Sequence, residues 1–271
     1  MPKKIDFSQI QVMGILNLTP DSFYDGNRYL QEKNMLKRVE EMLNEGADII
    51  DIGAFSSRPG AGFVSYEEER KRLIPRLQQI VRKFPQAVIS IDTYRHQIAE
   101  ESIEKGASII NDISAGNLDD KMFETIARLQ VPYIMMHMQG TPENMQKNPQ
   151  YKNIVKEIIA FFEKKIEELA QLNFNKIIID PGFGFGKTLK QNYELLAHLE
   201  DFNQLNFPVL AGMSRKSMLY KLFKSKPADM LSATSSVNTV ALLHGAKILR
   251  VHDVKEAVEV VKIVNTLKEF I

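Results

Sequence analysis

Residues 88–116 read VISIDTYRHQIAEESIEKGASIINDISAG, and this stretch contains one complete structural unit. Two short apolar runs, 88–91 and 109–110, flank an amphipathic segment, and Gly106 stands where a helix would end before the second run. This order predicts a strand, a helix and a second strand. Because such a connection joins parallel strands through a right-handed crossover, the stretch predicts a parallel sheet covered by helices.

The same unit recurs along the whole chain. Apolar residues return at intervals of three and four in the segments between strands, most clearly in 150–172, and Gly46 and Gly245 mark two further helix ends. Eight units in about 250 residues fit an α/β fold of the (β/α)8 TIM barrel type, with a doubly wound open sheet as the structural rival. We expect residues 1–271 to form a single domain. The predicted strands are 12–16, 49–52, 88–91, 109–110, 133–136, 177–179, 209–211 and 248–251.

Composition narrows the classes of function. The 271 residues carry 35 Lys+Arg and 34 Asp+Glu, a formal net charge of +1, without the positive excess typical of nucleic-acid-binding proteins. The absence of cysteine excludes disulfides, thiolate zinc sites, iron–sulfur clusters and a cysteine nucleophile. No apolar run approaches the roughly 18 to 20 residues of a membrane span, and the N-terminus lacks the pattern of a signal peptide. We therefore expect a cytoplasmic protein with no nucleic-acid or membrane partner.

Polar side chains follow every predicted strand. In a barrel, these positions gather on the rim at the carboxyl ends of the strands, where active sites form. A single polar residue at such a position is often only a helix cap, but eight in succession indicate a site. The residues are Asn17, Asp51, Asp92, Asn111, Asp112, His137, Asp180, Ser214, Arg215, Lys216, Arg250 and His252.

Nine of these polar residues, with Arg58 from a loop, fall into two chemical groups. Carboxylate and amide acceptors suit a ring rich in N–H donors, such as an aminopyrimidine. Cationic donors suit an anion, and a barrel commonly binds phosphate after strands seven and eight. We therefore expect a ligand with a donor-bearing ring at one end and a phosphate or carboxylate at the other. The acceptors are Asp51, Asp92, Asn111, Asp112 and Asp180. The anion-binding group is Arg58, Lys216, Arg250 and His252, with Asn17.

Several common motifs fail on inspection. Residues 182–188, GFGFGKT, resemble a phosphate loop, but Pro181 stands where that motif needs glycine, and the spacing also misses the dinucleotide fingerprint. The five histidines lack metal-ligand spacing, and Ser214 lacks the glycine pattern of a serine hydrolase. The pattern leaves a Schiff-base role for Lys216 open, although the neighbouring Arg215 favours binding of an anion or a carbonyl.

Two loops, 18–29 and 54–66, are long for barrel connections. Loops of this length on a barrel rim are usually functional lids. The first carries Asp21 and Asp25 near its middle, and the second carries Arg58. We expect both loops to contribute to the site.

Eight motifs, one in each strand–helix unit, resemble those of a known family. They are NLTPDSFYDG (17–26), DIGAFSSRPGA (51–61), SIDTYR (90–95), INDISAG (110–116), MMHMQGTP (135–142), DPGFGFGKT (180–188), GMSRKS (212–217) and RVHDV (250–254). Across essentially its whole length, the sequence resembles the dihydropteroate synthase family. The resemblance implies a pterin-binding (β/α)8 barrel that is usually a homodimer and a sulfonamide target.

The resemblance also implies a reaction. In this reaction, 4-aminobenzoate displaces pyrophosphate from 6-hydroxymethyl-7,8-dihydropterin pyrophosphate and gives 7,8-dihydropteroate, an intermediate in folate biosynthesis. The chain would then be a Mg²⁺-dependent transferase. We expect a dissociative transition state, because the electron-rich ring stabilises positive charge on the methylene while cations and Mg²⁺ stabilise the departing pyrophosphate. No general base is needed, because an arylamine is already a nucleophile at pH 7.

Roles for individual residues follow from the same resemblance. The pterin ring would be held by Asp92, Asn111, Asp180, Lys216 and Arg250. The pyrophosphate would be held by Asn17, Arg58, Arg250 and His252, with Asn17 also a ligand of Mg²⁺. The 4-aminobenzoate would be bound by Ser57, Pro59, Phe185 and Ser217, the last at a helix start where amide N–H groups face an anion. The residues expected to act in catalysis are Asp25, Arg58, Asp92, Lys216, Arg250 and His252.

Three residues depart from the family's usual pattern, all on the expected 4-aminobenzoate side. Ser57 stands where threonine is usual, Phe55 where a small or acidic residue is common, and Met213 where a small residue is common. They bear on affinity for 4-aminobenzoate and sulfonamides. Two alternatives stay open: a methyltetrahydrofolate:corrinoid methyltransferase-like domain, which would not be expected to carry the segment 214–217, and a catalytically idle pterin-binding paralogue.

Overall fold

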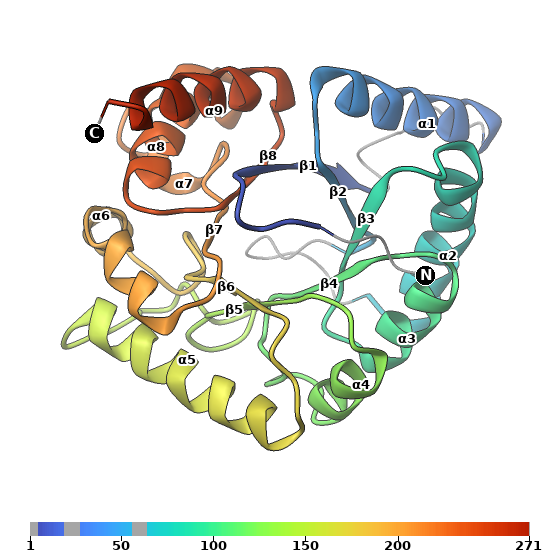
Figure 1. Cartoon of the computed structure of the whole chain (residues 1–271), viewed down its shortest axis with the longest axis horizontal. Helices are drawn as coiled ribbons and strands as arrows, with labels where there is room; N and C mark the ends of the chain where they lie inside the picture. Colours follow the sequence, from blue (N-terminus) through green and yellow to red (C-terminus); the bar gives the residue numbers. More distant parts are fainter. Residues whose placement is uncertain (1–4, 19–27, 56–63, 271) are drawn as a thin grey trace.

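The computed structural model describes residues 5–18, 28–55 and 64–270. Within these ranges, eight parallel strands follow the order β6-β5-β4-β3-β2-β1-β8-β7. A parallel bridge between Ile179 and Val209 closes β6 on β7, and the Ile179 N–H donates to the Pro208 carbonyl at 2.9 Å. Figure 1 shows the helices arranged around the ring of strands. The predicted (β/α)8 TIM barrel is confirmed, and the open doubly wound sheet is excluded.

The elements alternate as the sequence pattern predicts. The strands are β1 (Gln11–Asn17), β2 (Ile49–Gly53), β3 (Val88–Asp92), β4 (Ile109–Asp112), β5 (Tyr133–Met136), β6 (Ile177–Asp180), β7 (Leu210–Ala211) and β8 (Ile248–Val251). The helices are α1 (Arg28–Glu45), α2 (Tyr66–Lys83), α3 (His96–Glu104), α4 (Met122–Leu129), α5 (Ile154–Gln171), α6 (Leu189–Ala197), α7 (Ser217–Tyr220), α8 (Leu231–Leu243) and α9 (Val254–Lys268). Two 3₁₀ helices, Leu199–Leu205 and Pro227–Asp229, lie on either side of β7.

All eight predicted strands are confirmed, with ends that differ by at most two residues. The largest difference is in β4, which extends through Asp112 rather than ending at Ile110. The predicted helix in 150–172 begins at Ile154, because the Asn153 side chain caps it by accepting the Lys156 N–H at 3.0 Å. Sequence periodicity therefore located the elements, and at α5 a capping residue set the start of the helix.

Side-chain alternation along the strands produces an apolar floor inside the barrel. Each residue of this floor is at most 1% exposed, and burying a large aliphatic side chain contributes about 1.5–3 kcal/mol. Its members are Met13, Ile49, Ile109, Ile134, Ile178, Leu210 and Ile248. Because side chains point the same way every second residue, the next inward positions lie directly above the floor. Four of these positions are polar: Asp51, Asn111, Asp180 and Arg250.

The intervening positions face the helices instead. Ile50, Ile110 and Leu249 belong to the larger core cluster between the strands and the helical layer. The barrel therefore has an apolar core between its strands and helices, and a layer of polar side chains inside it, above the apolar floor. The candidate site lies at this polar layer.

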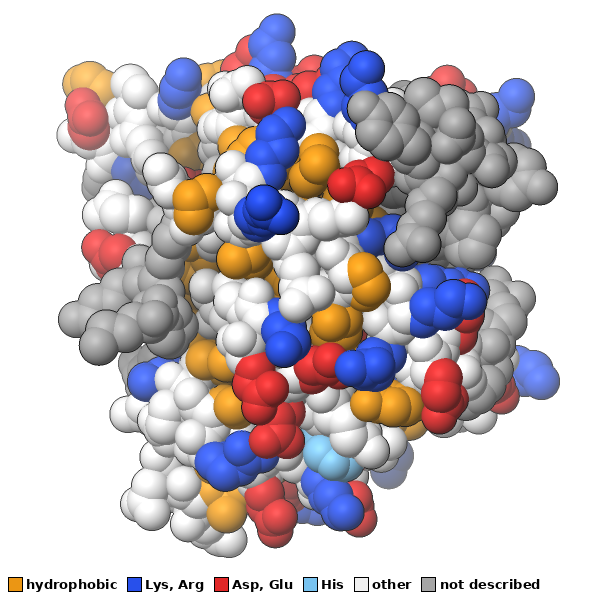
Figure 2. Space-filling model, turned by 90° about the vertical axis from the view of Figure 1, so that its right-hand side faces the viewer, with side chains coloured by type: hydrophobic (Ala, Val, Ile, Leu, Met, Phe, Trp, Pro, Cys, Tyr) orange, Lys and Arg blue, Asp and Glu red, His pale blue; other side chains and the backbone are white. Residues whose placement is uncertain are grey.

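Charges of both signs are interspersed on the face shown in Figure 2, among scattered hydrophobic side chains. This distribution agrees with the formal net charge of +1. In the described part of the chain, no helix combines the length and apolar character needed to cross a membrane.

Candidate active site

A cavity lies above the apolar floor, at the carboxyl ends of strands β3 to β8. It contains all five residues predicted to hold a pterin and Phe185, predicted for the 4-aminobenzoate side. Sequence analysis did not anticipate Ile113 and Met136, which add an apolar surface. The lining residues are Asp92, Asn111, Ile113, Met136, Asp180, Phe185, Gly212, Lys216 and Arg250.

Arg250 connects two carboxylates in this cavity. Its Nε donates to Asp51 Oδ2 at 2.6 Å, and its Nη2 donates to Asp92 Oδ2 at 2.8 Å. Burial alone would lower the pKa of Arg250, but the two carboxylates more than offset this and raise it. Asn111 joins the network, because its Nδ2 donates to Asp51 Oδ2 at 3.2 Å. The guanidinium is therefore a permanent cation that offsets part of the negative charge in the pocket.

The second oxygens of these carboxylates lack a hydrogen-bond partner among the residues that the structure describes. Both Asp51 Oδ1 and Asp92 Oδ1 are buried and unpaired. Burial raises the pKa of Asp92 to about 7, against the opposing effect of Arg250. Buried acceptors without partners carry a free-energy cost, which a ligand that brings N–H donors would remove.

Asp180 and Lys216 form the other side of the cavity. Asp180 Oδ1 accepts the Gly182 N–H at 2.8 Å, and burial raises the pKa of Asp180. Lys216 donates from Nζ to the Phe183 carbonyl at 2.5 Å, and the same atom lies 4.6 Å from the ring centre of Phe185. Burial lowers the pKa of Lys216 to about 8. Lys216 is therefore mostly protonated near neutral pH and can donate to a ring carbonyl.

The predicted pyrophosphate residues Asn17 and His252 lie at the ends of their strands. Asn17 is the last residue of β1, and His252 follows β8. The His252 Nδ1 lies 3.0 Å from Ser214 Oγ, and the His252 N–H donates to the same hydroxyl at 3.2 Å. These two contacts let Ser214 hold the imidazole of His252 in place.

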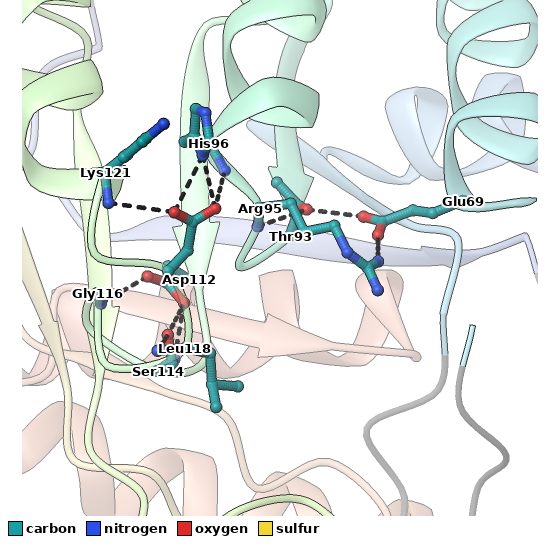
Figure 3. Close-up of polar contacts among 10 residues, drawn as sticks. Glu69, Thr93, Arg95, His96, Asp112, Ser114, Gly116, Leu118 and Lys121 are labelled. Atoms are coloured by element: carbon teal, nitrogen blue, oxygen red, sulfur yellow. Dashed lines mark hydrogen bonds and ion pairs between the residues drawn. The ribbon is translucent and has the colours of Figure 1, made fainter. Parts of the chain in front are cut away.

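One predicted acceptor, Asp112, does not face the cavity, and that expectation was wrong. It stands one position after the inward-facing Asn111, so its side chain points outward toward the loop before α4. Its carboxylate accepts hydrogen bonds from the Ser114 N–H and hydroxyl, the Gly116 N–H and the Tyr133 hydroxyl, at 2.6–2.8 Å. Figure 3 shows this carboxylate against the turn that it holds.

The structure also corrects the expected positions of three other residues. Two of them point outward because side chains alternate along a strand, and the third turns away because of its backbone conformation. His137, next after the inward Met136, is 7% exposed and packs edge-on against Phe161. Met213 is fully buried in the outer core, so it is not available to contact 4-aminobenzoate. Arg215, at φ +55°, turns its guanidinium to Asp253 with bonds of 2.6 and 2.9 Å rather than to an anion.

The expected 4-aminobenzoate side is apolar where it is described. Phe55 packs edge-to-face on Tyr94 with ring centres 5.4 Å apart, and both lie against a buried cluster that also contacts Phe185. Ser217 begins α7, which is only four residues long. So short a helix has little dipole, and any anion at Ser217 would depend on local N–H groups.

Comparison with known proteins identifies the family. The family described as pterin binding enzyme matches residues 13–252. The chain is 44% identical to the dihydropteroate synthase of Escherichia coli K12 over 96% of this chain and 93% of that protein. A Yersinia pestis dihydropteroate synthase solved with a sulfonamide drug has a TM-score of 0.91 and 42% identity, covering 98% of this chain and 96% of that one. A Xanthomonas albilineans dihydropteroate synthase solved with 4-aminobenzoic acid has a TM-score of 0.90 and 34% identity, covering 97% and 95%.

The chain belongs to the dihydropteroate synthase family. The family predicted from the eight motifs, and with it a transferase of folate synthesis, is confirmed.

Part of the predicted dihydropteroate synthase site falls outside the described residues. These residues are Asp25, in the loop after β1, and Ser57, Arg58 and Pro59, in the loop after β2. Their predicted roles stay predictions.

A buried carboxylate that sequence analysis missed supports the base of the second loop. Glu69, on α2, is fully buried, accepts the Thr93 hydroxyl at 2.7 Å and pairs with Arg95, as Figure 3 shows. Arg95 also donates to the Val64 carbonyl at 2.6 Å. The pattern SIDTYR therefore supplies both Asp92 for the cavity and a support for the chain beside it.

The resemblance to dihydropteroate synthases implies a bound Mg²⁺ ion, and the described side chains can be compared with the ligands that this ion needs. In residues 5–18, 28–55 and 64–270, no three His, Cys, Asp or Glu side chains form a metal cage. Asn17 offers a hard amide oxygen at the end of β1. Mg²⁺ is usually bound by one or two protein oxygens together with substrate phosphates. Asn17 therefore offers one oxygen that fits a Mg²⁺ ion bound together with substrate phosphates.

Proposed function

We propose that this chain joins 6-hydroxymethyl-7,8-dihydropterin pyrophosphate to 4-aminobenzoate in the cavity above the barrel floor, releasing pyrophosphate and forming 7,8-dihydropteroate. The observation that carries this assignment is the buried oxygen of Asp92 that lacks a partner among the described residues, beside Asn111 on the cavity wall. A pterin ring presents several N–H donors on one edge, which such acceptors match. Support comes also from the family and from the relative solved with 4-aminobenzoic acid.

The pterin would lie between the acceptors and Lys216. Asp92, Asn111 and Asp180 would take its N–H donors, while Lys216 would donate to the ring carbonyl. Ile113 and Met136 offer an apolar surface for the ring. Arg250 would shift from the carboxylate oxygens that it now holds and flank the ring.

The pyrophosphate would be bound at the rim by Arg250, His252 and Asn17, with Arg58 and Asp25 from the loops. Asn17 would hold Mg²⁺, which supplies Lewis-acid stabilisation of the pyrophosphate charge when bound. Cations at this end favour departure of the leaving group, because negative charge grows on it as the C–O bond breaks.

The chemistry is a substitution at the methylene carbon of the dihydropterin. The C–O bond to pyrophosphate breaks, the 4-aminobenzoate nitrogen forms the new C–N bond, and that nitrogen releases one proton to solvent. Asp92 and Asp180 would stabilise the positive charge that develops on the ring system. Ser57, Pro59, Phe185 and Ser217 would hold the second substrate so that its nitrogen faces the carbon.

The first experiment measures pyrophosphate release with Mg²⁺ and the pterin pyrophosphate, with and without 4-aminobenzoate. Release that depends on 4-aminobenzoate is the expected result. Release without it would indicate hydrolysis and a damaged second-substrate pocket. No release while a pterin still binds would support the idle paralogue instead.

Substitutions test the assigned pterin contacts directly. Lys216→Ala and Asp180→Ala should each lose pterin affinity, because each leaves buried partners unpaired. Calorimetric titration with a pterin measures this, and unchanged affinity would remove the role. Arg58→Ala should instead lower the rate while pterin binding is kept.

We propose further that the chain is a cytoplasmic homodimer built from a single pterin-binding barrel domain, residues 1–271. The family resemblance supports a dimer, and so do exposed apolar side chains on neighbouring helices α8 and α9, including Leu243, Ile263 and Leu267. Light scattering on the purified protein should give twice the chain mass of 31.0 kDa. A single-chain mass at micromolar concentration would contradict the dimer.

A further inference from the structure

Lys187 is a buried lysine that the proposed reaction does not use. It is 3% exposed, in the loop between β6 and α6. Its Nζ donates to the carbonyls of Gly182 at 2.9 Å and Phe185 at 3.0 Å, and lies 3.4 Å from the carbonyl and 3.2 Å from the Nδ1 of His137. Among the described residues, no carboxylate lies within ion-pair distance of Lys187. Its ammonium is therefore solvated by the protein backbone.

These bonds fold the loop around the ammonium. Gly182 has φ +74°, and a Cβ on this residue would collide with the His137 carbonyl, so the loop lies tightly against the end of β5. On its other side, Asn192 of α6 accepts the Gly184 N–H at 2.6 Å and donates to the Thr188 carbonyl at 2.7 Å. An ammonium group has three donors and no acceptor, which suits several converging carbonyls.

The loop that Lys187 holds presents three groups to the cavity. The Phe183 carbonyl accepts from Lys216, and the Phe185 ring lies under the same ammonium. The Gly182 N–H donates to Asp180. Two of these groups contact Lys216, and one of them, the Phe185 ring, is expected to border 4-aminobenzoate, while Asp92 and Asn111 stand on separate strands.

We propose that Lys187 is a positioning residue for the second substrate, which fixes the Phe185 ring and the Phe183 carbonyl around Lys216 without touching either substrate. This inference rests on the proposed function, in which Phe185 borders the 4-aminobenzoate. Burial lowers the pKa of Lys187 to about 7, so the loop is held by a lysine that is strongly desolvated. Loss of its ammonium would leave the Gly182 and Phe185 carbonyls without a donor and free Phe185 to move.

The test compares Lys187→Met with Lys190→Met, an exposed lysine on α6 three residues further on. For Lys187→Met, we expect the KM for 4-aminobenzoate to rise at least tenfold, while the dissociation constant of 6-hydroxymethylpterin changes less than threefold. Lys190→Met should change neither. Equal losses for both ligands, or no change in KM, would overturn the inference.

Chemical rescue separates a role of the ammonium from general damage. The chain has no cysteine, so Lys187→Cys introduces a single thiol. Alkylation by 2-bromoethylamine in urea, followed by refolding, forms a C–S bond with loss of bromide and restores an ammonium at nearly the length of lysine. Alkylation by iodoacetamide gives a neutral side chain of similar size. The protein with Lys187 intact, unfolded in urea and refolded in the same way, controls for refolding.

We expect the aminoethylated protein to recover the KM for 4-aminobenzoate and the carbamidomethylated protein not to recover it. Complete alkylation without recovery, or equal recovery by both reagents, would overturn the inference. If every variant lacking the ammonium fails to fold, Lys187 belongs to the fold rather than the site, and the inference also fails.

Phe185→Ala distinguishes this failure from a failure of the proposed function. It should raise the KM for 4-aminobenzoate on its own. If Phe185→Ala leaves that KM unchanged, the proposed placement of the second substrate is wrong. If Phe185→Ala raises the KM and Lys187→Met does not, only the role of Lys187 is wrong.

Discussion

The guanidinium of Arg250 donates to the Asp92 carboxylate at 2.8 Å, which connects the end of β8 to the end of β3. Arg250 also donates to Asp51, so one cation contacts two buried carboxylates at this level of the barrel. A pterin's N–H donors would replace the guanidinium at these acceptors. Arg250 therefore offsets part of the negative charge of these two carboxylates, and removal of Arg250 should reveal how much stability this contributes.

Arg250→Met should lower the free energy of unfolding by about 3–5 kcal/mol at pH 8, because breaking a buried pair leaves unpaired charge. The pKa of Asp92 is already raised to about 7 and would rise further without Arg250. Protonation below that pKa removes the buried charge, so the loss should shrink at pH 5. Urea unfolding at both pH values measures this.

Arg70→Met provides the control, because Arg70 also makes two bonds to one carboxylate, Glu101, but is half exposed. Solvent screens this pair, so its loss should have little effect at either pH. Equal destabilisation by the two substitutions would contradict the account of Arg250.

The pH dependence of kcat/KM for the pterin pyrophosphate should have limbs near 7 and 8. Asp92 accepts N–H donors best when ionised, so affinity should increase as pH rises through its pKa of about 7. Lys216 donates only when protonated, so affinity should decrease above its pKa of about 8. Titration with 6-hydroxymethylpterin, which carries no phosphate, should show the same two limbs, and a flat response from pH 6 to 9 would contradict both assignments.

The sequence predicted the fold well because strands, helix ends and the apolar floor repeat with fixed periods. It predicted Asp92, Asn111 and Asp180 as cavity residues for the same reason. The error at Asp112 was avoidable, since counting two residues from Ile109 leads to Asn111 and excludes its neighbour. Counting from Leu210 in the same way reaches Gly212 and excludes Met213.

Other features could not be read from residue types. Lys187 binds backbone carbonyls, and the direction of a carbonyl depends on the loop's dihedral angles rather than on the side chains in its sequence. Arg215 turns away because of its left-handed backbone conformation, which the sequence SRKS does not indicate. Such contacts are set by tertiary structure.

Met213→Ala and Phe55→Ala should separate stability from substrate binding. Met213 is fully buried, so truncation should lower the free energy of unfolding by about 2–5 kcal/mol and leave the KM for 4-aminobenzoate unchanged. Phe55 packs on Tyr94 beside Phe185, so its truncation should raise that KM severalfold with pterin affinity kept. Thermal unfolding and steady-state kinetics on both variants test the contrast, which would fail if Met213→Ala altered the KM.

Asp112→Ala and Asp92→Asn should likewise give opposite outcomes, although both acids stand at strand ends. Asp112 accepts four hydrogen bonds from its own turn and from Tyr133, so its loss should cost about 3 kcal/mol of stability or more, with pterin affinity in the folded fraction little changed. Asp92→Asn removes a buried negative charge that Arg250 neutralises only in part, so the substitution should cost little stability. It also places an amide N–H donor at a position that must accept the N–H groups of the pterin. We expect near-normal stability and a loss of pterin affinity of at least a hundredfold. Calorimetric titration measures the pterin affinity of both variants, and urea unfolding measures their stability. A pterin affinity that falls more for Asp112→Ala than for Asp92→Asn would reverse the assignment of the two acids.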